Sequence, residues 1–253
     1  MPPTIAALAA EIHGAVEAAA GHAAPRPDRK FNKDDEFVAY GLKTDVWRDV
    51  MRGFRARINA LSLEDRLDLA DGLFGMRIGE LGHSAIYALA LSTSELGPQH
   101  FKRLDRMADG FTGWSHVDDF CIAVLQPLLL AHRPETLALL ERWSRSPNRW
   151  KRRASVVAFV RKVGESGDFT EEALRLCENL VGDREDIVRK GVGWALKDVM
   201  RGDGERVLAY VKELRRRGVP AVITLYAIRD LRGQERDEVL QVRRRVDLPP
   251  TAP

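Results

Sequence analysis

The chain has 253 residues, of which 45% are hydrophobic and 30% are charged. This length allows a sizeable core, in one large domain or in a repeat array. No apolar run approaches the roughly 18–20 residues that a membrane-spanning helix needs, so a membrane protein is not expected. The net charge of +3 does not by itself indicate a nucleic-acid partner. Cys121 and Cys177 have no metal or redox spacing, which favours a reducing cytoplasm.

The N-terminal segment predicts a short helix over residues 1–22. Its Ala-rich run is interrupted by Glu11 and Glu17, where a signal peptide would be continuously apolar. Residues 23–33 predict a linker, because Pro25 and a second proline two residues later disfavour a helix among mostly polar neighbours.

Beyond the linker, apolar residues recur at steps of three and four, which is typical of helices, and no run alternates as a strand would. The first half predicts helices around residues 45–58, 63–74, 80–91 and 98–108. The second half repeats with a period of about 35–37 residues. Its three predicted helix pairs cover residues 134–143 with 148–160, 170–180 with 185–196, and 204–214 with 219–228.

The repeat predicts an all-α fold: a curved right-handed solenoid of HEAT-like or armadillo-like helix pairs. One pair cannot bury its apolar side alone, so successive pairs stack and leave an extended concave face. We predict one such domain over residues 34–245, followed by a disordered tail over residues 246–253. The solenoid predicts a binding shape and no particular function.

A basic stretch lies in the middle of the chain. Residues 142–162 contain eight Arg or Lys residues and no acidic residue. This concentration could bind phosphates even though the chain as a whole is nearly neutral. The same stretch could equally be a solvated helix face.

Three predicted second helices combine aromatic, acidic and basic residues. In 113–120, Trp114 and Asp118 are four apart and share one helix face. Each of the other two contains a tryptophan, which is Trp150 in one and Trp194 in the other. Each tryptophan could instead pack in the core, and the acid could serve only the start of its helix. The basic residues of these segments are Arg149, Arg152, Arg153, Lys190 and Lys197.

The order of these motifs resembles a known family. G-W-x-x-V-D at 113–118 is followed by N-x-W-x-x-R-A at 148–154 and R-K-x-x-G-W-A-L at 189–196. This order resembles the AlkD-type DNA glycosylases, a HEAT-like DNA alkylation repair family, over roughly residues 35–232. Ser115 departs from the family pattern, which more often has Asp there.

The resemblance implies a base excision repair enzyme that binds alkylated double-stranded DNA as a monomer and needs no cofactor. It implies hydrolysis of the N-glycosidic bond of cationic N3- or N7-alkylated purines, without base flipping. Trp114, Asp118 and Trp194 fall on the family's catalytic positions, and Arg153 falls on its phosphate-contacting arginine. We expect the neighbouring cations Arg149, Arg152, Lys190 and Lys197 to bind DNA too, in a cytoplasmic, nucleoid-associated protein.

Two alternatives stay open. A non-catalytic HEAT-like protein could bind damaged or branched DNA, although such a binder would not need Asp118 near a phosphate. A protein-interaction scaffold would need no clustered cations. No metal site is expected, because the six histidines show no ligand-type spacing.

Overall fold

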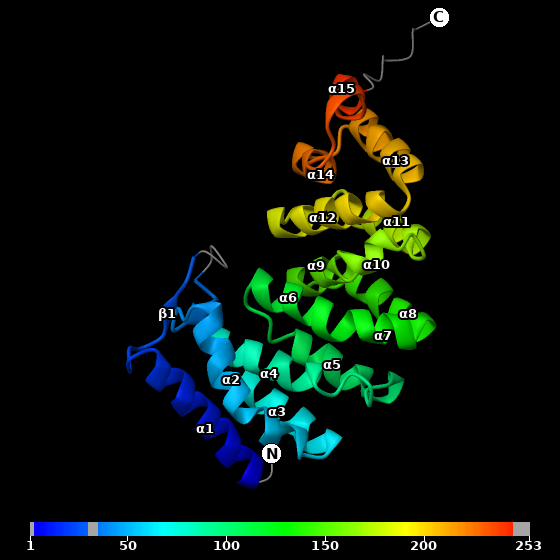
Figure 1. Cartoon of the computed structure of the whole chain (residues 1–253). Helices are drawn as coiled ribbons and strands as arrows, with labels where there is room; N and C mark the ends of the chain where they lie inside the picture. The colour runs from blue at the N-terminus through cyan, green and yellow to red at the C-terminus, as the bar shows by residue number, and fades with distance from the viewer. Residues whose placement is uncertain (1–2, 30–34, 245–253) are drawn as a thin grey trace, which may run out of the picture. The chain divides into compact units, whose positions relative to one another are not determined.

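The structure is a computed structural model that describes residues 3–29 and 35–244 (Figure 1). Helices make up most of the described residues, which confirms the predicted all-α class. None of these helices is long and apolar enough to cross a bilayer. The contacts divide the chain into two compact units, Met1–Leu139 and Leu140–Pro253. The single domain over 34–245 stays a prediction, and the predicted tail, 246–253, lies outside the described residues.

The first unit contains the N-terminal helix and the less regular half of the sequence. Its helices lie close to the predicted ranges, and its core includes Leu67, Leu81 and Phe120, each fully buried. The π-helical segment η2 continues α6 into α7 without a break, since the residues between them keep helical dihedral angles. The elements are α1 (Pro3–Ala19), α2 (Thr44–Asn59), α3 (Leu63–Gly75), α4 (Gly79–Ala90), η1 (Pro98–His100), α5 (Phe101–Ala108), α6 (Trp114–Phe120), η2 (Cys121–Leu125) and α7 (Gln126–Ala131).

The predicted linker takes part in a small strand pair. β1 (Arg26–Pro27) pairs antiparallel with β2 (Val38–Ala39). The expectation that the chain contains no strand is therefore wrong at this point. Strands of two residues are too short to show the alternation by which strands are recognised in a sequence.

The segment after the linker packs against the starts of two helices, α4 and α6. Glu80, in the first turn of α4, accepts backbone N–H groups from Tyr40, Gly41 and a third residue, at 2.8–3.0 Å. Phe37 is buried against Gly113, where an added Cβ would lie 2.5 Å from its ring. Glycine is therefore required just before α6, and the start of α6 is fixed by packing.

Helix starts follow ordinary capping chemistry. The Ser62 side chain accepts the backbone N–H of Asp65 at the start of α3, at 3.2 Å. Asn148 accepts the backbone N–H of Trp150 in the same way at 2.8 Å. Such caps satisfy N–H groups that lack a partner within the helix.

The second unit contains the regular repeat. α8 (Arg133–Ser144) crosses the boundary between the units, and every later predicted helix is present. Trp143, Phe159 and Leu196 contribute to its core. A Cβ on Gly193 would lie 2.6 Å from Tyr226, so glycine lets α12 and α14 pack closely. The helices are α9 (Arg149–Val157), α10 (Lys162–Glu165), α11 (Thr170–Glu178), α12 (Asp186–Gly202), α13 (Gly204–Arg217), α14 (Ala221–Ala227) and α15 (Gly233–Gln241).

Candidate nucleic-acid and catalytic site

In the first unit, the predicted catalytic acid and its tryptophan lie on one short helix. Trp114 is the first residue of α6, and Asp118 follows one turn later. Both side chains are partly exposed. Residues four apart on a helix project from the same face, so an aromatic ring and a carboxylate are presented together, as the sequence predicts.

His83 of α4 contacts two side chains of α6. The Nδ1 atom of His83 lies 3.0 Å from Asp119 Oδ2, and its Nε2 atom lies 3.3 Å from Ser115 Oγ. The ring of Trp47, from α2, meets the His83 ring edge-on at 5.9 Å. The sequence did not predict His83, Ser115 and Asp119 as site residues. His83 and Asp119 stand 36 residues apart on different helices, so no local spacing in the sequence links them.

His116, to which no role was assigned from the sequence, is part of the core. Its Nε2 atom lies 2.8 Å from the carbonyl oxygen of Gly79, and its Nδ1 atom is buried with no hydrogen-bond partner among the described residues. Burial, followed by the nearby His83 ring, lowers the pKa of His116 to about 3. His116 is therefore neutral in the folded protein at ordinary pH.

This buried histidine predicts a pH dependence of stability. An unfolded histidine has a pKa near 6.5, so His116 contributes stability that is complete above about pH 6.5. That contribution is lost as the pH falls toward 3, by about 1.4 kcal/mol per pH unit. We expect the free energy of unfolding of the wild type to fall more steeply between pH 6 and pH 4 than that of His116→Gln. Urea denaturation at three pH values would measure both slopes.

The control for that experiment is His132→Gln, which removes a partly exposed imidazole at the end of α7. It should keep the wild-type slope. Equal slopes for the wild type and His116→Gln would contradict the assignment of a neutral, buried His116.

In the second unit, the arginines of α9 differ in their surroundings. Arg153 is buried, and its Nη1 atom donates a hydrogen bond to the carbonyl oxygen of Ile187 at 2.7 Å. Arg152 donates to both carboxylate oxygens of Asp183, at 2.6 and 3.3 Å. Both guanidinium groups are thus held by the protein itself. The predicted DNA contacts of Arg152 and Arg153 would have to use their remaining donors.

The third arginine of α9, Arg149, is more accessible. The Arg149 guanidinium lies 4.9 Å from the centre of the Trp150 ring and 3.8 Å from a carboxylate oxygen of Glu185. Trp150 itself is 4% exposed, so of its two possible roles the structure favours core packing. Arg149 covers this tryptophan and is partly exposed.

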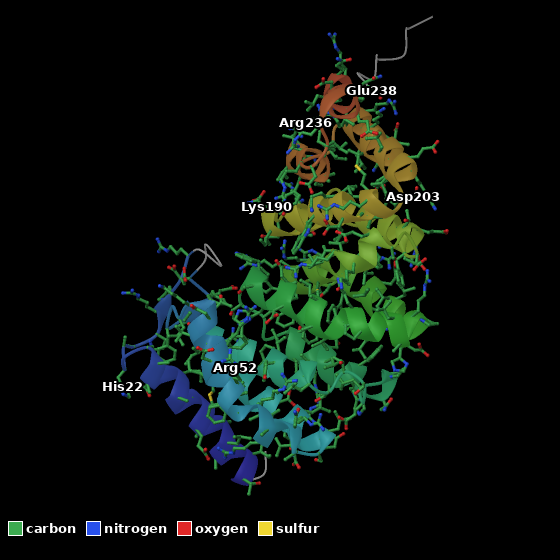
Figure 2. All side chains as sticks on the ribbon, viewed as in Figure 1. His22, Arg52, Lys190, Asp203, Arg236 and Glu238 are labelled. Atoms are coloured by element: carbon green, nitrogen blue, oxygen red, sulfur yellow. The ribbon has the colours of Figure 1, made fainter. Side chains whose placement is uncertain are left out.

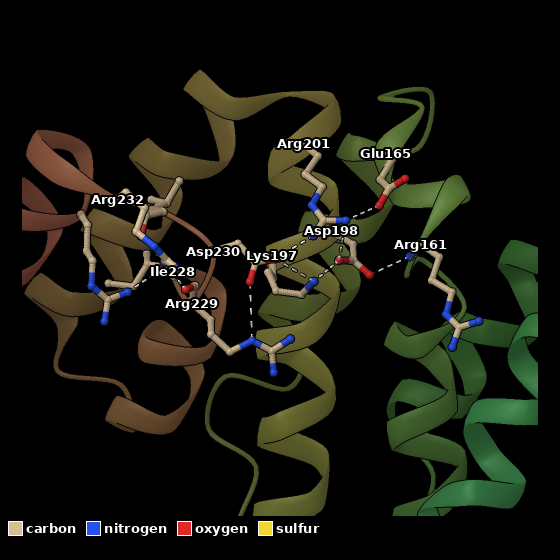
Figure 3. Close-up of polar contacts among 11 residues, drawn as sticks. Arg161, Glu165, Lys197, Asp198, Arg201, Ile228, Arg229, Asp230 and Arg232 are labelled. Carbon is tan, nitrogen blue, oxygen red and sulfur yellow. Dashed lines mark hydrogen bonds and ion pairs between the residues drawn. The ribbon is translucent and has the colours of Figure 1, made fainter.

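The predicted site residues of α12 differ in their exposure to solvent. Lys190 (labelled in Figure 2) is exposed and lies 2.8 Å from Asp186, one turn earlier, and Trp194 is partly exposed. Lys197 is buried, with its ammonium 2.5 Å from Asp198 and 3.2 Å from Asp230 (Figure 3). Lys190 can therefore reach a phosphate, whereas the charge of Lys197 is compensated within the protein.

The described residues contain no group of three or more His, Cys, Asp or Glu side chains arranged to hold a metal ion. The arrangement offers a carboxylate and an aromatic face in the first unit. In the second unit it offers a partly exposed tryptophan and accessible cations. These are groups that attract a cationic base, a developing positive charge and phosphates.

Comparison with known proteins decides the family. Residues 15–231 match the family described as DNA alkylation repair enzyme. The chain belongs to the DNA alkylation repair enzyme family. Among proteins of curated function, none matches the sequence.

Two solved structures share the fold with this DNA alkylation repair family member. One is described as a predicted DNA alkylation repair enzyme from Enterococcus faecalis: 13% identity, TM-score 0.66, with 87% of this chain and 95% of that chain covered. The other is the Pseudomonas fluorescens alkylpurine DNA glycosylase AlkC, bound to DNA containing an abasic site analog. Its identity is 18% and its TM-score 0.52, with 95% of this chain and 69% of that chain covered.

Proposed function

We propose that this member of the DNA alkylation repair enzyme family is an AlkD-type DNA glycosylase. It would hydrolyse the N-glycosidic bond of cationic N3- or N7-alkylated purines in duplex DNA, acting as a cytoplasmic monomer. The observation that carries this proposal is the pair formed by Trp114 and Asp118, partly exposed one turn apart on α6. The AlkC structure, a glycosylase bound to DNA, supports the class of reaction.

The proposed chemistry starts from a base made cationic by alkylation. The bond between C1′ and the base nitrogen breaks, and its electron pair leaves with the base, which becomes neutral. The sugar is left as an oxocarbenium ion, as in glycoside hydrolysis. The Asp118 carboxylate would stabilise this developing positive charge. A water oxygen then bonds to C1′ and loses a proton.

The aromatic residues would bind the lesion before the bond breaks. A cation over the face of a tryptophan gains roughly 0.5–2 kcal/mol, and both Trp114 and Trp194 are partly exposed. We propose that the concave face of a HEAT-like solenoid receives the duplex, so that the base is cut without being flipped. Lys190 and Arg149 would contact phosphates, with salt-dependent affinity.

Hydrolysis by water, rather than attack by a protein amine, is the expected route. An amine nucleophile must be uncharged, and the two lysines of α12 are placed against carboxylates. Lys197 contacts both Asp198 and Asp230, while Lys190 contacts Asp186. Each of these nitrogens is held in an ion pair within the protein, which leaves it poorly placed to attack C1′, so a monofunctional hydrolase is proposed.

The direct test is release of the damaged base by the wild-type protein. Duplex DNA containing a single N7-methylguanine would be incubated with excess protein, and abasic sites would be converted to strand breaks and counted. We expect release well above the spontaneous rate and none from the undamaged duplex. Binding to the duplex without release, repeated with N3-methyladenine, would contradict the glycosylase and favour a non-catalytic binder of damaged or branched DNA.

A further inference from the structure

His83 joins α4 to the catalytic face of α6 through two side chains one turn apart. Its two ring nitrogens lie 3.0 Å from Asp119 Oδ2 and 3.3 Å from Ser115 Oγ. The His83 side chain is 24% exposed. A partly exposed imidazole held at both nitrogens has a fixed orientation, and all three residues belong to the first unit.

The identities of these partners determine where the protons lie. A carboxylate can only accept hydrogen bonds, so the nitrogen facing Asp119 carries the proton. In the neutral ring the other nitrogen is then an acceptor, to which the Ser115 hydroxyl donates. The hydroxyl has therefore used its only hydrogen. Toward any further group, Ser115 can act only as an acceptor.

A second acceptor lies one turn along the same face. Ser115 and Asp118 are three residues apart on α6, a spacing at which side chains are neighbours. A water molecule that donates one hydrogen to each of two acceptors keeps its lone pairs for another partner. This is the orientation a water needs in order to attack an electrophilic carbon.

We propose that Ser115, fixed as an acceptor by His83 and Asp119, acts with Asp118 to orient the water that attacks C1′. This inference rests on the proposed glycosylase function. The water oxygen bonds to C1′ after the base has departed with the electron pair of the broken bond. The proton that the water loses passes to the Asp118 carboxylate and then to solvent. His83 is a positioning residue, since it acts through Ser115.

Single-turnover release from the N7-methylguanine duplex would test this inference with the full-length protein. We expect Ser115→Ala and His83→Gln to lower the rate constant about 10- to 100-fold, at or below the lower end of the range for positioned acid–base groups, because both act on the water indirectly. Ser115→Thr, which keeps the hydroxyl, should retain most of the rate. The Kd for the duplex should change less than about threefold. The matched control is His132→Gln, expected to behave as the wild type.

A second measurement does not depend on activity. Nitrogen-15 NMR of the free protein should show the His83 proton on Nδ1, and Asp119→Asn should change this tautomer. A proton on Nε2 would overturn the inference. Release at the wild-type rate by both Ser115→Ala and His83→Gln would overturn it too, while leaving the glycosylase intact. No release by the wild type would overturn both proposals.

Discussion

The Asp118→Asn variant is expected to lose base release while keeping its affinity for damaged DNA. Asparagine has almost the same shape but no charge, so it cannot stabilise the positive charge that develops on the sugar. Removing one preorganised electrostatic group from an active site typically slows the reaction about 10²–10³-fold. Single-turnover release from the N7-methylguanine duplex would measure the rate constant, and fluorescence anisotropy would measure the Kd.

The control removes the same charge elsewhere in the first unit. Glu135→Gln neutralises an exposed carboxylate in the first turn of α8 and should leave the rate unchanged. If Asp118→Asn released the base at the wild-type rate, Asp118 would not be the catalytic carboxylate. If Asp118→Asn and Glu135→Gln lost activity equally, the loss would reflect the change in the protein's net charge and not the removal of a catalytic group.

The structure also distinguishes Asp118 from its neighbour Asp119. Two adjacent carboxylates stand in α6, and the sequence predicts Asp118 as the acid because it lies four residues after Trp114. In the structure Asp119 Oδ2 lies 3.0 Å from His83 Nδ1, which fits the role of orienting that ring that we propose for it. Asp118, one turn after Trp114, is the carboxylate that we propose for the sugar.

The helices of this fold could be predicted because their signals are local. Apolar spacing, capping residues such as Asn148 and the glycines between helices all act within a few residues of the chain. They placed α9 and α12 within a few residues of their observed starts. The strand pair was missed because its signal is a contact between two segments that each contribute only two residues.

The site was predictable in its residue types but not in its contacts. Helical spacing predicts that Lys190, Trp194 and Lys197 lie near one another on α12. It does not predict which other segments pack against each of these residues. The structure shows that Asp230, 33 residues further on, reaches Lys197. The partners of His83 were hidden for the same reason, because they lie on another helix, α6.

Replacing Lys197 is therefore expected to have the largest effect on the free energy of unfolding. The Asp198 side chain is 2% exposed, and its Oδ2 atom accepts the backbone N–H of Arg161 at 2.7 Å (Figure 3). Its other oxygen has no hydrogen-bond partner among the residues that the structure describes, and the Lys197 ammonium at 2.5 Å compensates its charge. Lys197→Met would leave this carboxylate buried with too little compensation. Removing one partner of a buried ion pair costs about 3–5 kcal/mol.

Urea denaturation would measure the loss, and the double variant Lys197→Met/Asp198→Asn would test its cause. Asparagine can still accept the Arg161 N–H but carries no charge, so the double variant should be more stable than Lys197→Met alone. The matched control is Lys190→Met, which breaks an exposed pair on the same helix and should cost less than about 1 kcal/mol. The effects of the two variants on DNA affinity should be in the opposite order. Lys190→Met should weaken binding more than Lys197→Met, because Lys190 is exposed and can reach a phosphate, whereas Lys197 is buried. A double variant less stable than Lys197→Met would contradict this account, and a stable Lys197→Met with weakened DNA binding would restore Lys197 to the DNA-binding surface.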